Sequence, residues 1–377
     1  MMFLRCSVLY RVHVLELSTG QKHPDTTSTG VVDHSAGDNH FSFAIQISGQ
    51  YVGVMFISHD VHDNQLLVWN WRTGATELVS ITHRLRALPL IGNFQSLRGS
   101  EIGSFGFVTD RHILLAVVDN PLIDPEEDGL IERSLIVVDF KTAPKESTSL
   151  GDLNFECALD LPRMLPTASV VAISARSDPA PNWTPSPDLK VPFHTARRDR
   201  LFVITIWVAG GGNVSALLLL VPSSTIVAKL DSVSPDERGR RFDWEEWGPS
   251  GTHLRLAPRE HTMIWVCFVF GSSFIAPYRP HNPSPLLPPP GPKMIQIFDF
   301  NQLAIKRLLD EGVEDESEVS HVITKPSTVT LNRIFPNPVV TSLPYRWRTK
   351  KAPHHPGYTF ESAMLSEDAI VTVTSVS

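Results

Sequence analysis

The segment QLLVWNWRTG, residues 65–74, decides the fold class of this chain. It consists of Leu, Val and Trp up to Asn70, and the pair Thr73-Gly74 closes it. Branched and aromatic residues suit the pleated, half-buried surface of a strand, whereas Asn and Gly favour turns. The segment therefore predicts a short β-strand that ends in a tight turn.

The same unit, an aliphatic strand followed by a polar residue and a turn, recurs along the chain. The other copies are HVLELSTG (13–20), IVVDFKTA (136–143), QIFDFNQ (296–302) and the degraded LLVPSST (219–225), which has Pro222 at the polar position. A second unit, a turn leading into an apolar strand, alternates with the first. Its copies are SGQYVGVMF (48–56), TDRHILLAV (109–117), RDRLFVITI (198–206), EHTMIWVCF (260–268) and SEDAIVTV (366–373). Each neighbouring pair of units predicts the inner strands of one four-stranded blade, a pattern typical of β-propellers.

Few segments favour helix, and the best of them is Leu303–Leu309, which could also be an outer strand. The 30 prolines and 22 glycines are typical of many turns between short strands. We predict an all-β, irregular β-propeller-like fold with WD-like blades, in a single domain over residues 1–377. The ring is expected to be closed by the N- and C-terminal strands, with residues 10–17 hydrogen-bonded to residues 368–374.

Three segments predict long loops between strands. Residues 177–199 and 277–292 are rich in proline, and residues 310–318 (DEGVEDESE) are strongly acidic. None of them has enough apolar residues for a core of its own, so we expect exposed loops of a single domain.

Composition excludes several classes of protein. The net charge of -7 argues against a nucleic-acid-binding protein, and three cysteines are too few for a disulfide framework. No apolar run is long enough to span a membrane, and the first residues lack the features of a signal peptide. We therefore expect a cytoplasmic or nuclear protein in a reducing compartment.

The repeated polar positions Glu16, Asn70, Asp139 and Asp299 have two interpretations. Asn, Asp or Glu before a turn accepts hydrogen bonds from backbone N–H groups two residues further on. Alternatively, Asn70, Asp139 and Asp299 line a central channel and bind a metal ion. We favour turn formation, because the same residue type recurs around a ring.

Four further features suggest chemistry but also have a structural interpretation. The cluster His59–Asp63 contains two histidines and two aspartates, which can bind a divalent cation, but it lies within one expected hairpin loop. The other histidines are dispersed, so their spacing identifies no third ligand, and we favour an exposed hairpin. Gly210-Gly211-Gly212 predicts a hairpin turn and not a phosphate loop. Cys267 is expected to be a buried apolar residue. We expect an exposed loop at the basic cluster Arg238–Arg241.

Two aromatic segments suggest binding surfaces. Arg346–Lys351 (RWRTKK) has one tryptophan among basic residues, which could support nucleic-acid contact, but we expect an exposed loop there. Trp244 and Trp247 could form a patch for a protein partner, although packing between blades is the favoured interpretation.

Several segments together resemble the C-terminal half of F-box proteins of mushroom-forming fungi. They are SHDVHDNQLLVWNWRTG (58–74), FVTDRHILLAVVDN (107–120), RLFVITIWV (200–208), WEEWGPSGTHLRL (244–256), MIWVCFVFGSSFIAPY (263–278), LPYRWRTK (343–350) and ESAMLSEDAIVTV (361–373). Their shared order extends over nearly the whole chain, and LVWNW is similar to the strand end of WD-type propellers. The resemblance implies a substrate receptor of a cullin-type ubiquitin ligase. We find no N-terminal F-box, so a Skp-type adaptor is expected only if a missing F-box is supplied.

These observations predict a non-catalytic protein-interaction module with no cofactor, metal or catalytic residues. Its protein partner and its partner-binding residues are not identified by the sequence, and neither nucleic acid nor membrane is expected as a partner. The first alternative is a propeller hydrolase or lyase that uses a carboxylate or metal site in the central channel. The second is a scaffold unrelated to ubiquitin.

Overall fold

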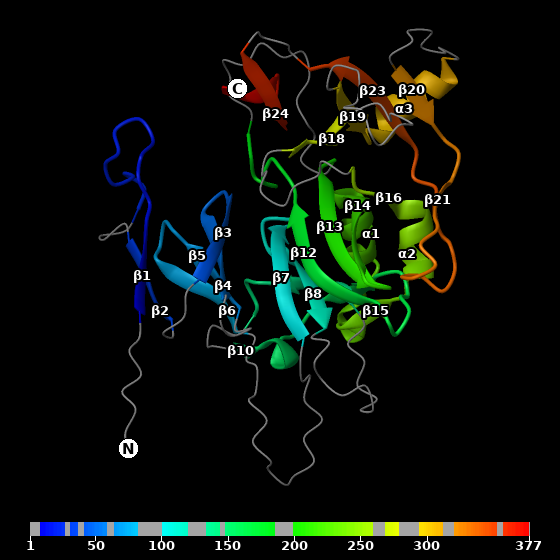
Figure 1. Ribbon diagram of the computed structural model, residues 1–377. Helices are drawn as coiled ribbons and strands as arrows, with labels where there is room; N and C mark the ends of the chain where they lie inside the picture. The colour runs from blue at the N-terminus through cyan, green and yellow to red at the C-terminus, as the bar shows by residue number, and fades with distance from the viewer. Residues whose placement is uncertain are drawn as a thin grey trace. The chain divides into compact units, whose positions relative to one another are not determined.

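The computed structural model (Figure 1) describes residues 8–26, 31–36, 41–58, 64–81, 100–119, 133–143, 148–184, 199–258, 268–278, 294–311, 320–352 and 357–376. Among them, 53% lie in strands and 12% in helices, which confirms the all-β prediction. No helix in the described ranges is both long and apolar enough to cross a membrane.

The described chain forms two compact units. Unit 1 contains Met1–Asp160, Ala180–Asn182 and Val233–Arg241, and unit 2 contains Leu161–Pro179, Trp183–Ser232 and Phe242–Ser377. The single domain over 1–377 stays a prediction.

Unit 1 contains two antiparallel sheets whose strands follow each other in chain order. The first contains β3 (Phe41–Ser48), β4 (Tyr51–Ser58), β5 (Gln65–Asn70) and β6 (Ala75–Ile81), with the short β10 (Thr148–Ser149) parallel to β6. The second contains β7 (Ser100–Phe107), β8 (His112–Asp119), β9 (Ser134–Asp139), β11 (Cys157–Asp160) and β15 (Arg240–Phe242). A short 3-10 turn, Leu150–Asp152, precedes β11. Strands β5 and β9 are buried on both faces, which explains their nearly continuous apolar sequences.

Unit 2 also has two larger sheets. The first has the order β12 (Ser169–Arg176), β13 (Leu201–Gly210), β14 (Asn213–Pro222) and β16 (His253–Leu256), and Figure 1 shows β12, β13 and β14 side by side. The second has the order β17 (Val269–Phe270), β18 (Ser273–Tyr278), β19 (Met294–Asp299), β23 (Tyr345–Lys351) and β20 (Ser320–Ile323). Hairpin β21 (Ser327–Val329) with β22 (Val339–Thr341) completes this part of the unit.

The paired units of the sequence form neighbouring strands, as predicted. In each pair, the first residue of the strand after the turn lies opposite the repeated polar position of the next strand. These pairs are Tyr51 with Asn70, His112 with Asp139, and Leu201 with Pro222. In the fourth sheet, Asp299 lies opposite Ser273. The neighbour of β19 is therefore β18 and not the predicted strand at 260–268, of which residues 260–267 lie outside the described residues.

The terminal strands belong to local hairpins. Strand β1 (Val8–His13) pairs with β2 (Val31–Ala36), and β25 (Ile370–Val376) pairs with β24 (Tyr358–Leu365). The expected pairing of residues 10–17 with residues 368–374 is not among the strand pairs of the described residues. Ring closure, like the propeller itself, stays a prediction.

Among the described residues, three α-helices interrupt the strands. Helix α3 (Gln302–Asp310) confirms the helical interpretation of Leu303–Leu309. Helices α1 (Ser223–Asp231) and α2 (Trp244–Gly251) were not predicted, and the single-turn Pro235–Glu237 lies between them. Pro222 precedes α1 directly, and a proline's fixed φ suits a helix start as well as it suits a turn, so the degraded repeat at 219–225 was misread as a turn.

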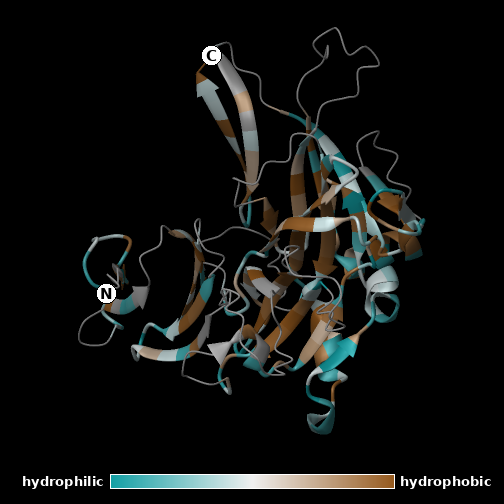
Figure 2. Cartoon of the chain, turned by 60° about the horizontal axis from the view of Figure 1, so that its bottom comes forward, coloured by the Kyte–Doolittle hydropathy of each residue, from teal (hydrophilic) through white to brown (hydrophobic). Residues whose placement is uncertain are grey.

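The three predicted loops are only partly described. Residues 177–184 contain no helix or strand, while residues 185–198 lie outside the described residues. In the predicted loop 277–292, residues 277 and 278 belong to β18, and the rest lies outside the described residues. In the predicted loop 310–318, Asp310 ends α3, Glu311 follows it, and the rest lies outside the described residues. Figure 2 shows apolar residues along the strands of the sheets and hydrophilic residues at turns and helix surfaces.

Candidate partner-binding groove

Asn70, Asp139 and Asp299 form their turns, which confirms the structural interpretation at these three positions, whereas the Glu16 carboxylate accepts a hydrogen bond from the Thr19 hydroxyl at 2.7 Å. Asn70 Oδ1 accepts hydrogen bonds from the backbone N–H groups of Arg72 and Thr73, at 3.1 and 3.2 Å. Asp139 Oδ1 accepts one from Lys141 N–H at 3.0 Å. In unit 2, Asp299 Oδ1 accepts one from Asn301 N–H at 3.1 Å. Each Oδ1 acceptor binds the residue two positions further on, as an Asx turn requires.

The two aspartates among these residues also bind arginine. Asp139 pairs with Arg111, and Asp299 Oδ2 accepts a hydrogen bond from Arg346 at 3.0 Å. Burial alone would raise the pKa of Asp139, but hydrogen bonds from Arg111, Lys141 and Thr142 outweigh it and lower the pKa. The described residues contain no group of three or more His, Cys, Asp or Glu that could hold a metal ion. The cluster His59–Asp63 lies outside the described residues.

The paired tryptophans are not a surface patch. Trp244 and Trp247 lie on α2 with 7% and 1% of their surface exposed, and their rings make an edge contact at 5.3 Å. Both tryptophans are therefore packing residues, while packing between blades stays a prediction.

The glycine turn is confirmed, whereas the interpretation of Cys267 as a buried apolar residue stays a prediction. Gly211 and Gly212 have φ of +58° and +82° and form the two-residue turn between β13 and β14, where Gly210 pairs with Asn213. Cys157 is buried, and burial raises the pKa of its thiol to about 12, so this sulfur is not a nucleophile at neutral pH. Cys6 and Cys267 lie outside the described residues.

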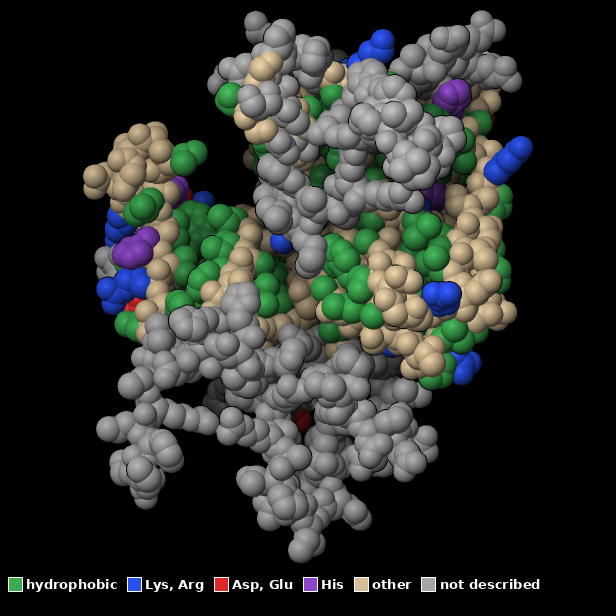
Figure 3. All heavy atoms as spheres, viewed as in Figure 1, with side chains coloured by type: hydrophobic (Ala, Val, Ile, Leu, Met, Phe, Trp, Pro, Cys, Tyr) green, Lys and Arg blue, Asp and Glu red, His purple; other side chains and the backbone are tan. Residues whose placement is uncertain are grey.

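The basic cluster Arg238–Arg241 is held by acids of unit 1, and the predicted loop is wrong for Arg240 and Arg241, which belong to strand β15. Arg238 lies 3.4 Å from Glu156, Arg240 lies 3.9 Å from Glu237, and Arg241 pairs with Asp160. On the face in view in Figure 3, the described Lys and Arg side chains are separated by apolar and uncharged ones. This distribution is unlike the continuous basic stripe of nucleic-acid-binding proteins.

The second basic segment was wrongly predicted as a loop. Residues 346–351 belong to β23, which pairs with β19 on one side and β20 on the other. Charged residues at alternate positions hid this strand, because Arg346 and Arg348 point to the opposite face from Tyr345 and Trp347.

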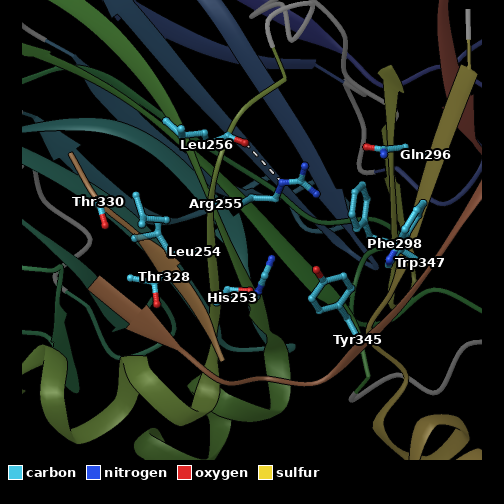
Figure 4. A pocket seen from close by; sticks show the side chains of 12 residues that line it. His253, Leu254, Arg255, Leu256, Gln296, Phe298, Thr328, Thr330, Tyr345 and Trp347 are labelled. Carbon is cyan, nitrogen blue, oxygen red and sulfur yellow. Dashed lines mark hydrogen bonds between the residues drawn. The ribbon is translucent and has the colours of Figure 1, made fainter. Parts of the chain in front are cut away.

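Tyr345 and Trp347 help to line an open cavity of about 470 Å³ in unit 2 (Figure 4). It lies between the edge strand β16 on one side and strands β19 and β23 on the other, with β21 beside β16. The lining residues are His253, Leu254, Arg255, Leu256, Gln296, Phe298, Ser327, Thr328, Val329, Thr330, Tyr345 and Trp347. We call this cavity the groove.

The aromatic wall of the groove results from strand register. Phe298 of β19 lies opposite Trp347 of β23, so both side chains share one face of the sheet. Tyr345 is two residues from Trp347 and lies on the same face. The ring of His321 on β20 lies 5.0 Å from the Trp347 ring, tilted by 38°, and supports it.

The opposite wall contains His253 and Arg255. His253 is 3% exposed, and its ring lies 4.5 Å from that of Tyr345. Burial, and secondarily the charge of Arg255, lowers the pKa of His253 to about 4. Burial also lowers the pKa of Arg255 and raises that of Tyr345. At neutral pH, Arg255 is therefore the one charged side chain among the residues that line the groove.

The Arg255 side chain extends from β16 toward Phe298 on the aromatic wall (Figure 4). Its guanidinium carbon is 4.3 Å from the centre of the Phe298 ring, and its Nε donates to the Leu256 carbonyl at 3.4 Å. In the described part of the chain, its terminal nitrogens have no hydrogen-bond partner and no carboxylate within ion-pair distance. The groove can therefore hold an apolar group against the rings and an acceptor at the guanidinium.

Sequence reasoning missed this site. The only available signal was alternation: HLRL at 253–256 and YRWR at 345–348 each place two polar or aromatic residues on one strand face. A comparison of the chain with protein-family models and with curated proteins finds no match.

Proposed function

We propose that the protein is a non-catalytic protein-interaction module that binds a segment of another protein in the groove of unit 2. The observation that carries this proposal is the grouping of Arg255, Tyr345 and Trp347 around one open cavity. Arg, Tyr and Trp are the residue types that contribute most to protein–protein affinity. Here they lie on paired strands, which hold a binding surface in place better than loops do.

The environment of the repeated carboxylates supports binding over catalysis. The enzyme alternative needs Asn70, Asp139 and Asp299 to act on a substrate or metal in a central channel. Each instead accepts a backbone hydrogen bond in its own turn, and two of them also bind an arginine. Turn formation therefore accounts for their recurrence without a reaction.

For the fold, we propose that the four sheets are blades of an irregular WD-like β-propeller within one domain, closed by its terminal strands. In three of the four sheets the strands follow each other in chain order, as in propeller blades, and in the fourth β23 lies between β19 and β20. Edge strand β3 also exposes Phe43, Ile45 and Ile47, all on one face and 48–61% exposed. An apolar face of this kind is what a neighbouring blade would cover.

The resemblance to fungal F-box proteins suggests where such a module acts. We propose a substrate receptor of a cullin-type ubiquitin ligase, in the cytoplasm or nucleus, with its Skp-type adaptor joined through an F-box. The scaffold alternative differs only in its partners. Purification from the source organism distinguishes them: Skp and cullin subunits should accompany the receptor in stoichiometric amounts, and their absence would favour the scaffold.

Photocrosslinking from the groove tests the binding function. p-Benzoylphenylalanine replaces Thr328 in the groove of the full chain, and in the control it replaces Val171, which is 59% exposed on β12. We expect one protein to crosslink from position 328 and not from 171. The purified protein should then bind wild type but not Thr328→Trp, which fills the groove.

Two results would overturn this proposal. The first is equal binding of the captured protein to wild type and to Thr328→Trp. The second is turnover in a broad hydrolase screen together with a stoichiometric metal ion, with the turnover abolished by replacing the metal's ligands.

A further inference from the structure

We propose that the groove recognises the carboxylate of an Asp or Glu side chain in the partner segment, and that Arg255 is the residue that selects it. This inference rests on the proposed function and adds the chemistry of the occupant. It is argued from the partners of Arg255, from the charge of the other lining residues, and from the shape of the aromatic wall.

Arg255 is held in place but its terminal donors are unused. A guanidinium has five N–H donors in a fixed plane, and here Nε–H is directed to the Leu256 carbonyl. The Phe298 ring lies against the cation at 4.3 Å and fixes its plane. The terminal N–H groups, which have no partner among the described residues, form the fork that binds a carboxylate through two parallel hydrogen bonds.

The other lining residues add no charge, so the groove suits one negative charge. No Asp or Glu is among them, and His253 is neutral at physiological pH. The hydroxyls of Ser327, Thr328 and Thr330 and the amide of Gln296 are uncharged donors and acceptors. Recognition of a dianionic phosphate group normally uses a cluster of arginines, whereas a single guanidinium matches a carboxylate.

The aromatic wall indicates that the carboxylate belongs to a protein segment. Phe298, Tyr345 and Trp347 form a wall beside Arg255 that suits the aliphatic part of an acidic side chain or an apolar neighbour. The Ser327 hydroxyl bonds to Tyr345, and the Thr328 hydroxyl of β21 lines the groove on the side of β16, where it can bind a backbone group of an extended chain. An acidic segment with an adjacent apolar residue matches both walls.

A random dodecapeptide library displayed on phage tests the inference, selected against the full chain. Enriched peptides should share an Asp or Glu. Arg255→Gln should weaken the best peptide by about tenfold or more, as expected for a charged hydrogen-bonded pair. The matched control Lys141→Gln, which removes a cation of unit 1, should change affinity less than about twofold. Isothermal titration gives each affinity.

A second arm needs no protein variant, so it remains informative if Arg255→Gln does not fold. Glu→Gln in the peptide should cost about as much as Arg255→Gln, and the two changes together should cost little more than one, because they remove the same contact. Phosphoserine in place of the Glu should bind less tightly. Tighter binding of the phosphopeptide would overturn the carboxylate assignment.

The remaining outcomes separate this inference from the proposed function. Some selected peptides could lose affinity for Thr328→Trp and yet keep their affinity after Arg255→Gln in the protein and after Glu→Gln in the peptide. That result would overturn the inference and leave the protein-binding function standing. If no peptide is selected, N-acetylglutamate N-methylamide is titrated alone. Saturable binding lost in Arg255→Gln would support carboxylate recognition and contradict protein binding, and no binding would overturn both.

Discussion

Each unit contains two larger sheets, but the units differ in how the space between the sheets of one unit is filled. In unit 1, Phe105 and Phe107 of β7 pack with Tyr51 of β4 and Phe140 in a continuous apolar core. Phe105 lies so close to Gly53 that a Cβ there would be 2.5 Å from its ring. In unit 2, an apolar core also joins β13 and β14 to β18 and β19, but between β16 and β23 lies the open groove of about 470 Å³.

The charges around the cavities of the two units differ in the same way. A cavity of about 330 Å³ at the turns of unit 1 has Arg72 and Lys141 in its lining. Arg72 lies 3.1 Å from Asp25, and Lys141 lies 4.0 Å from Asp110. Arg255 in the groove has no such carboxylate among the described residues. The cations at the cavity of unit 1 therefore have carboxylate neighbours, whereas the groove of unit 2 retains an available cation, as a binding site for an anion requires.

Acid should weaken the groove more than any other described region. The pKa of His253 is lowered from 6.5 unfolded to about 4 folded, so the unfolded chain binds a proton more readily between these values. Stability is therefore full above pH 6.5 and falls as the pH falls to about 4, by roughly 3 kcal/mol. Urea unfolding at pH 7 and pH 4.5 measures the loss.

His253→Gln should remove most of this pH dependence, because the glutamine does not titrate. The matched control His13→Gln, at an exposed position of β1 in unit 1, should retain it. Equal acid sensitivity of wild type and His253→Gln would show that the groove histidine is not the buried neutral group described above.

Removing a turn carboxylate tests what the units have in common. Asp139→Ala should lower the free energy of unfolding by about 2–3 kcal/mol, because a buried acceptor of a backbone N–H and of Arg111 is lost. Asp299→Ala should cost about 1 kcal/mol, since its side chain is 16% exposed against 2% for Asp139. Thermal and urea unfolding measure both. A larger effect at Asp299 would contradict the shared structural role.

Adding one methyl group to each region tests the difference in packing. Gly53→Ala in unit 1 should cost about 2 kcal/mol, because its Cβ would overlap the buried Phe105 ring. Ser327→Thr adds the same group to the wall of the groove and should cost less than about 0.5 kcal/mol. Equal costs in urea unfolding would mean that the groove is packed as tightly as the core of unit 1.

The strands and turns could be predicted because their signals are local. Asn70 and Asp139 act within three residues of themselves, and the glycine pair at 211–212 fixes its own hairpin. Helix α2 was missed because WEEWGPSG contains two glycines and a proline, residues that oppose a helix. Its start is stabilised by Asp243 and Glu246, whose side chains bond to each other's backbone N–H groups in a capping box.

The groove could not be predicted because no local pattern specifies it. Arg255 and Trp347 are far apart in sequence and share a cavity only because two sheets of unit 2 are packed together. The strand that contains Trp347 was hidden by its basic residues. The missing carboxylate partner of Arg255 is a property of the folded neighbourhood, which the acidic composition of the chain as a whole does not reveal.

Hydrogen–deuterium exchange of the full chain tests most directly the claim that unit 2 contains the binding surface. The exchange of each segment is compared with and without a saturating concentration of the tightest acidic peptide, or of the protein captured from position 328. We predict slower exchange in β16, β21 and β23, and unchanged exchange in β4, β5, β8 and β9 of unit 1. Slower exchange confined to unit 1, or no change in β16 and β23, would contradict the account.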